Sequence, residues 1–89
     1  MQFKEGTHVY TAGGDDVGTI DRVVVDPRTK EVSHVVVRKG LLFTEDKVVP
    51  IDLIARATDE RVTLREDAGN LDELPPFKET QYVSLDEEE

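Results

Sequence analysis

The chain contains no cysteine, so neither disulfide bonds nor cysteine-ligated zinc can stabilise it. No apolar run approaches the ~20 residues that cross a bilayer, and the start, MQFKEGTHVY, lacks the apolar stretch of a signal peptide. We therefore expect a soluble, cytoplasmic protein without a transmembrane segment. The 89 residues have room for one domain. A chain this short buries only ~60% of its unfolded surface, so a compact sheet, self-association or both must stabilise it.

Basic residues are also scarce. Eleven Lys and Arg stand against twenty Asp and Glu, which gives a formal net charge of −9. Residues 1–74 hold ten basic and fifteen acidic side chains, a net of −5, whereas residues 75–89 hold one and five, a net of −4. Phosphate backbones repel such a surface, so we expect no direct nucleic-acid binding. The same charge favours a basic protein partner.

What the chain does contain is valine, in short runs separated by turn residues. We expect strands over 7–12, 17–25, 32–39, 47–49, 55–57 and 61–65. Within 32–39, Val36 alternates with Val35 and Val37, which indicates that both faces of this strand are at least partly covered. Short helical turns are expected after the fourth and sixth strands. Gly18 is the natural place for a bulge in the second strand.

Five or six short strands, close turns and no long amphipathic helix predict an all-β fold. We expect a small closed or partly open antiparallel β-barrel, or a sandwich. Closure is favoured, because an open sheet leaves edges that pair with other chains. The domain is placed at residues 1–74. Pro75 and Pro76 then break regular structure, and residues 75–89 form an acidic C-terminal tail that acts as a linker or an added strand.

Four segments carry a resemblance to a known family. They are VGTI at 17–20, VVVDPRT at 23–29, VSHVVV at 32–37 and VVPID at 48–52. In this order they resemble the PRC-barrel family, which is named after the cytoplasmic domain of the photosynthetic reaction-centre H subunit. The family also supplies one domain of the RimM-type ribosome maturation factors. The resemblance runs from about Gly6 to Leu74; it implies a role in protein docking or assembly and brings no catalytic residues with it.

The turn over 26–30 departs from this resemblance at one position. The family commonly has glycine at the end of the Asp-Pro turn, where this chain has Lys30. If the turn keeps its usual shape, Lys30 takes a positive φ at a cost of ~1 kcal/mol relative to glycine.

Residues that could carry chemistry are few. His8 and His34 lie on different expected strands, with no further ligand at a metal-site spacing. The acidic loop at 13–16 does not match the calcium-loop pattern and is typical of a plain turn. Carboxylate pairs at 45–46 and 59–60 are expected in solvated loops, which are poor settings for acid–base catalysis. We expect no catalytic, cofactor-binding or metal-binding residues, and hence no enzyme.

Two apolar segments are the candidate protein contacts. The first, at a hairpin tip, either folds over the barrel mouth or forms an exposed contact patch. The second, in the tail, belongs either to an acidic linker or to a strand added at a sheet edge of this chain or a neighbour. Their residues are Leu41, Leu42 and Phe43 in the first and Phe77, Tyr82, Val83 and Leu85 in the second.

We therefore predict a non-catalytic protein docking or assembly module of PRC-barrel type that self-associates as a homodimer. One alternative is a RimM-like role in ribosome assembly and RNA metabolism, in which the acidic barrel binds a basic ribosomal protein; the missing companion domain weighs against it. A second alternative is a metal-binding or enzymatic role. A third is that the chain is the leading segment of a longer stress-related or membrane-associated protein.

Overall fold

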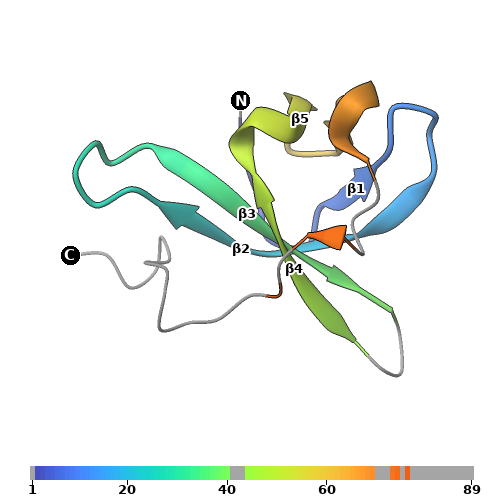
Figure 1. Cartoon of the computed structure of the whole chain (residues 1–89), viewed down its shortest axis with the longest axis horizontal. Coiled ribbons are helices and arrows are strands. Elements are labelled where there is room, and N and C mark those ends of the chain that lie inside the picture. Colours follow the sequence, from blue (N-terminus) through green and yellow to red (C-terminus); the bar gives the residue numbers. More distant parts are fainter. Residues whose placement is uncertain (1, 41–43, 70–72, 75, 77–89) are drawn as a thin grey trace.

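The structure, a computed structural model, describes residues 2–40, 44–69, 73, 74 and 76 of the chain. The described residues form six strands: β1 (His8–Tyr10), β2 (Asp16–Val25), β3 (Val32–Lys39), β4 (Glu45–Pro50), β5 (Ile54–Ala57) and β6 (Val62–Leu64). Short 3-10 turns follow two of them, η1 (Ile51–Leu53) after β4 and η2 (Glu66–Ala68) after β6. The predicted all-β class and the helical turns after the fourth and sixth strands are confirmed (Figure 1).

The strands form one sheet in the order β4-β3-β2-β1-β6-β5. Neighbouring strands are antiparallel, except that β1 and β6 are parallel, with Val9 beside Val62. The expectation of a wholly antiparallel sheet is therefore wrong for this pair. Strands joined by a short hairpin must be antiparallel, but β1 and β6 are remote in sequence and no hairpin sets their direction.

The expected closure of the barrel is not confirmed. Over the part of the chain that the structure describes, the sheet is not closed by hydrogen bonds, and β4 and β5 are its two edges. The three residues of η1 lead from one edge strand to the other. Pro50, the last residue of β4, has no N–H to donate to a further strand. Part of the free edge of β4 is covered instead by an antiparallel bridge between Lys47 and Pro76.

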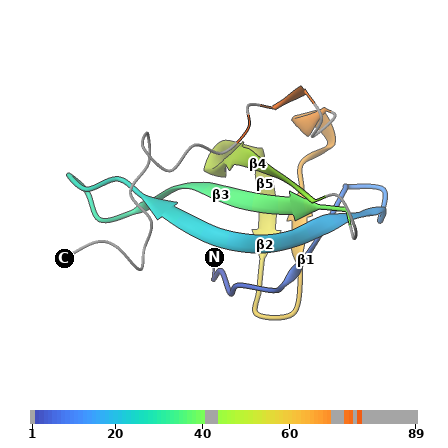
Figure 2. The same ribbon diagram turned by 90° about the horizontal axis from the view of Figure 1, so that it is seen from below.

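One hydrophobic core nevertheless takes side chains from all six strands. Its members are Val9, Ile20, Val23, Val35, Val37, Val49, Ile54, Ala57, Val62 and Leu64. A sheet that brings one face of six strands onto a single cluster must curl strongly, in the direction that strand twist allows. Figures 1 and 2 show this curl in the long, bent ribbons of β2 and β3. The fold is a curled sheet around a valine-rich core, open between its two edges.

The middle of β2, β3 and β4 is buried on both faces. Successive side chains of a strand point to opposite faces, so Val24, Val36 and Val48 point away from the core. They are nevertheless only 2%, 0% and 1% exposed. The prediction that both faces of the third strand are covered is therefore confirmed.

Two bulges in β2 adjust the register of this sheet. Against β1, the pairing steps from Gly18 to Asp16 and skips Val17. Against β3, it skips Asp21. The predicted irregularity near Gly18 is thus confirmed, whereas the bulge at Asp21 is not anticipated from the sequence. Each bulge shifts the alternation by one residue, which keeps the apolar side chains of β2 directed at the core.

The turn between β2 and β3 has the shape that the Asp-Pro motif predicts. The Asp26 side chain accepts a hydrogen bond from the Arg28 N–H at 2.8 Å. The Lys30 N–H donates to the Asp26 carbonyl oxygen at 2.8 Å, and Lys30 has a φ of 63°. The expected left-handed conformation of Lys30 is confirmed. Hydrogen bonds from the Arg28 side chain and N–H lower the pKa of the Asp26 carboxyl below its ordinary value.

Candidate functional site

All seven residues that the sequence predicts as protein contacts lie outside the described residues. They are Leu41, Leu42, Phe43, Phe77, Tyr82, Val83 and Leu85. The structure does describe the base of the hairpin to which the first three belong, since β3 ends at Lys39 and β4 begins at Glu45. The hairpin base is therefore the described part of the predicted contact region.

A groove of about 540 Å³ lies beside this hairpin base, and we call it the hairpin groove. Three strands line it. His8 comes from β1, residues 16–19 come from the start of β2, and Arg38 and Lys39 come from the end of β3, followed by Gly40. Both signs of charge thus meet at one surface hollow.

Two features of β2 shape the floor of the hairpin groove. Gly18 has a φ of 144°, and a Cβ at this position would clash with the Arg38 carbonyl oxygen, so only glycine lets β2 approach β3 this closely. The Asp16 carboxylate then fixes the strand start, because one oxygen accepts from the Gly18 N–H at 3.0 Å and the other lies 2.8 Å from His8 Nδ1. The groove is therefore held by backbone geometry as well as by side chains.

Arg38, in the lining of the groove, belongs to a charged cluster beside it. Arg38 donates from Nε and Nη2 to the two Asp46 carboxylate oxygens, at 3.0 and 3.3 Å, and its Nη2 lies 3.2 Å from Asp21 Oδ1. The hydrogen bonds to Asp46 and the charge of Asp21 raise the pKa of the Arg38 guanidinium above its ordinary value. Because the Arg38 side chain is 46% exposed, solvent screens these pairs, and their main effect is to fix the direction of Arg38.

The position of Asp46 corrects one expectation. The sequence places residues 45–46 in a solvated loop, whereas β4 already begins at Glu45 and Asp46 pairs across the strands with Arg38. The Asp46 side chain is 25% exposed. The carboxylate is therefore a structural partner of an arginine and is oriented by the sheet.

The two histidines lie apart, as expected. His8 is on β1 and His34 is on β3, and β2 separates these strands. The Nδ1 atom of His34 lies 2.9 Å from Ser33 Oγ. Within the described ranges, no group of three or more His, Cys, Asp or Glu side chains is arranged to hold a metal ion.

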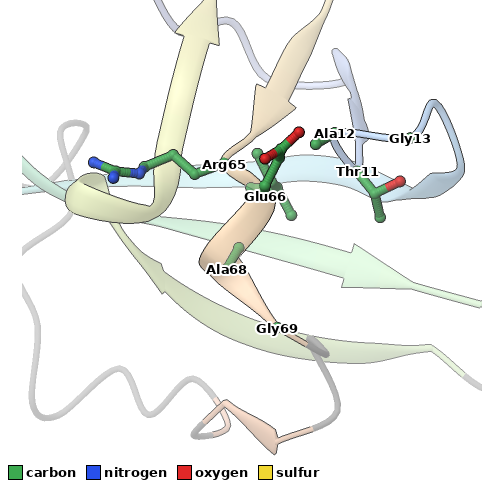
Figure 3. A pocket seen from close by; sticks show the side chains of 8 residues that line it. Thr11, Ala12, Gly13, Arg65, Glu66, Ala68 and Gly69 are labelled. Carbon is green, nitrogen blue, oxygen red and sulfur yellow. The ribbon is translucent and has the colours of Figure 1, made fainter.

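A second hollow, of about 360 Å³, lies between the β1–β2 turn and η2 (Figure 3). Thr11 Oγ1 accepts a hydrogen bond from the Asp15 N–H at 3.1 Å. The Arg65 side chain points away from Thr11 and donates from Nε to Asp67 at 3.1 Å. Each of these polar side chains forms its hydrogen bond within its own segment of the chain. The rest of the lining includes Glu66 and Ala68. The hairpin groove is the larger of these two hollows and adjoins the predicted contact hairpin, which makes it the stronger candidate.

Sequence reasoning missed the cluster of Arg38, Asp21 and Asp46, although part of it has a readable signal. In the β3–β4 hairpin, Lys39 pairs with Glu45 and Arg38 with Asp46. Opposite charges therefore stand at mirrored positions on either side of an apolar tip, a pattern that favours cross-strand pairing. The contribution of Asp21 has no such signal, because it depends on the bulge in β2.

Fold and groove together define a small, curled all-β domain whose strand ends carry paired charges. The family model of the PRC-barrel domain matches residues 5–71. The chain belongs to the PRC-barrel family, and the resemblance seen in the sequence is confirmed. Among curated proteins, none matches the chain. No helix in the described residues is long and apolar enough to cross a bilayer.

Proposed function

We propose that this chain is a non-catalytic docking module that binds protein, including a second copy of itself, through the β3–β4 hairpin. The observation that carries the proposal is the arrangement of charge at the hairpin base. Arg38 with Asp46, and Lys39 with Glu45, stand on either side of the three large apolar residues at 41–43. Protein interfaces combine an apolar centre with a polar rim, and this hairpin supplies residues of both kinds.

The base of the hairpin is well fixed, which favours binding. Val35, Val37 and Val49 anchor β3 and β4 in the core, and the carboxylates of Asp21 and Asp46 hold the Arg38 side chain in place. A surface that is already ordered loses less conformational entropy when a partner binds. This part of the contact therefore needs little rearrangement.

The chemistry of the partner follows from the charge of the chain. A net charge of −9 steers basic proteins toward the surface and repels polyanions. Binding of a basic partner should therefore weaken as salt is added, because salt screens exposed charges. Self-association through the apolar tip should depend less on salt, since apolar burial does not require opposite charges.

Self-association is tested by sedimentation equilibrium over a range of protein concentrations. We expect the unaltered chain to dimerise, and we expect Leu42→Glu and Phe43→Glu, each made separately, to shift it to monomer. Thr29→Glu is the matched control, because it adds the same charge at the exposed β2–β3 turn, at the opposite end of β3. A chain that is monomeric at every concentration would remove self-association from the proposal.

Partner binding is tested with the same three variants by affinity capture from native lysate. Far-UV circular dichroism should show that each variant keeps its β structure. A partner that binds the unaltered chain and Thr29→Glu, but is lost from Leu42→Glu and Phe43→Glu, would support the hairpin as the contact. Equal capture by all four proteins would contradict it.

A further inference from the structure

The second apolar face of the sheet is buried, and the core does not explain this. We define the outer face by Val24, Val36 and Val48, one residue from each of β2, β3 and β4. Their exposures are 2%, 0% and 1%. These three valines are not members of the core cluster. They are also not among the partly buried apolar side chains that pack against it.

An apolar sheet face is buried to this degree only when a layer covers it. Two described arginines lie beside it: Arg22 pairs opposite Val36, and Arg38 is directed toward Asp46 and Asp21 at the groove. Three valines with almost no accessible surface therefore require apolar side chains from another segment.

The course of the chain identifies a segment that can supply them. The Lys47 ammonium donates to the Leu74 carbonyl oxygen at 3.2 Å, and Pro76 pairs with Lys47 through the backbone. Residue 76 therefore lies at the edge strand β4, from which the following residues can reach the outer face. The 13 residues at 77–89 that follow can span about 40 Å when extended. Since neighbouring strands lie about 5 Å apart, this length is more than enough to cross β4, β3 and β2.

The composition of this segment matches the outer face in polarity and in charge. It holds the apolar residues Phe77, Tyr82, Val83 and Leu85, and its charged residues, one Lys against five Asp and Glu, give a net of −4. Arg22 contributes positive charge to the outer face, since it pairs opposite Val36. Apolar side chains can therefore meet the valines while the acids stay near Arg22.

We propose that the C-terminal segment 77–89 of this chain docks on the outer face and forms its covering layer. The segment then gives β2, β3 and β4 a second apolar layer, on the side opposite the core. This contact is separate from the proposed docking at the β3–β4 hairpin and does not depend on it.

The absence of cysteine allows a direct test with single introduced thiols. Val36→Cys places a thiol on the outer face, and Val35→Cys places one in the core as its matched control. The reaction of each thiol with a small aromatic disulfide is timed in the full chain, with and without Tyr82→Ser, Val83→Ser and Leu85→Ser together. We expect the tail substitutions to speed the reaction at position 36 at least about tenfold, equivalent to about 1.4 kcal/mol, and to leave position 35 unchanged.

Further variants and conditions show whether the tail of the same chain or a second copy covers the outer face. Replacement of Glu79, Thr80 and Gln81 by serine alters the same segment at polar positions, so it should leave the rate at position 36 within about twofold. An unchanged rate in the apolar tail variant would overturn the proposal. Equal acceleration at positions 35 and 36 would also overturn it, because the tail would then act on global stability. Protection at position 36 that rises with protein concentration would assign the cover to a second copy, and so reject the intramolecular contact.

Discussion

The two halves of the sheet are built differently. The strands β2, β3 and β4, which we call the long half, have 10, 8 and 6 residues. The strands β1, β5 and β6, the short half, have 3, 4 and 3 residues. The long half is buried on both faces, since Val35 and Val36, adjacent in β3, are 1% and 0% exposed. In β6, Val62 and Leu64 are buried while Thr63 between them is half-buried.

The amino-acid sequence accounts for this difference. The long half has consecutive valines at 23–25, 35–37 and 48–49, whereas β6 alternates apolar and polar residues. A strand covered on both faces has a continuous apolar run, whereas a strand with one solvent-exposed face alternates apolar and polar residues. The long half of this domain therefore needs two covering layers, and the short half needs one.

The largest effect is expected from a carboxylate placed on the outer face of the long half, compared with a carboxylate on the half-buried side of β6. Val36→Asp would bury a carboxylate without a partner and should cost about 3–5 kcal/mol of unfolding free energy, enough to unfold much of a small domain. Thr63→Asp, on the half-buried side of β6, should cost about 1 kcal/mol. Urea denaturation followed by circular dichroism measures both. Equal costs would show that the two halves are covered alike.

A smaller effect is expected at Gly18, where β2 pairs with β1 of the short half and closely approaches β3 of the long half. Gly18→Ala forces an unfavourable φ and a clash with the Arg38 backbone, and should cost about 2–3 kcal/mol. The control is Gly13→Ala, at which an added Cβ meets only Thr11 Oγ1 at 3.8 Å. The midpoint of urea unfolding measures both variants. If Gly13→Ala is the more damaging, close approach is not what requires glycine at position 18.

The smallest effect is expected in the turn that joins β2 to β3. Lys30→Gly relieves a left-handed conformation and should raise the unfolding free energy by about 1 kcal/mol. Thr29→Gly in the same turn is the control; Thr29 is not among the positive-φ residues, and glycine there should bring no gain. Thermal and urea unfolding at pH 7 measure the pair. Destabilisation by Lys30→Gly would show that the Lys30 side chain contributes more than its backbone costs.

Local features of the fold were predictable because they depend on neighbouring residues. Short runs of valine between turn residues located the strands, and the family resemblance implied the positive φ of Lys30. The parallel pairing of β1 with β6 was not predictable, since it joins Val9 to Val62 with no local signal for direction. The choice between a closed and a partly open barrel could not be made from the sequence for a related reason: closure depends on how far the whole sheet curls.

The candidate site was predictable only in part. The mirrored charges around the hairpin tip follow from pairing Arg38 with Asp46, but they become visible only when β4 is known to begin at Glu45. The place of Asp21 beside Arg38 depends on a bulge, and bulges leave little trace in sequence. The apolar contacts at 41–43 and 77–85 lie outside the described residues, so their role stays a prediction.

The parallel pair has a consequence for the order of folding. The strand at His8–Tyr10 leaves the ribosome before the strand at Val62–Leu64, so one of its edges has no partner until the later strand has also been synthesised. Contacts this distant in sequence close late, because the intervening loop loses entropy before the contact forms. The nascent chain can form its three long strands first, and the emergence of the sixth strand completes the domain.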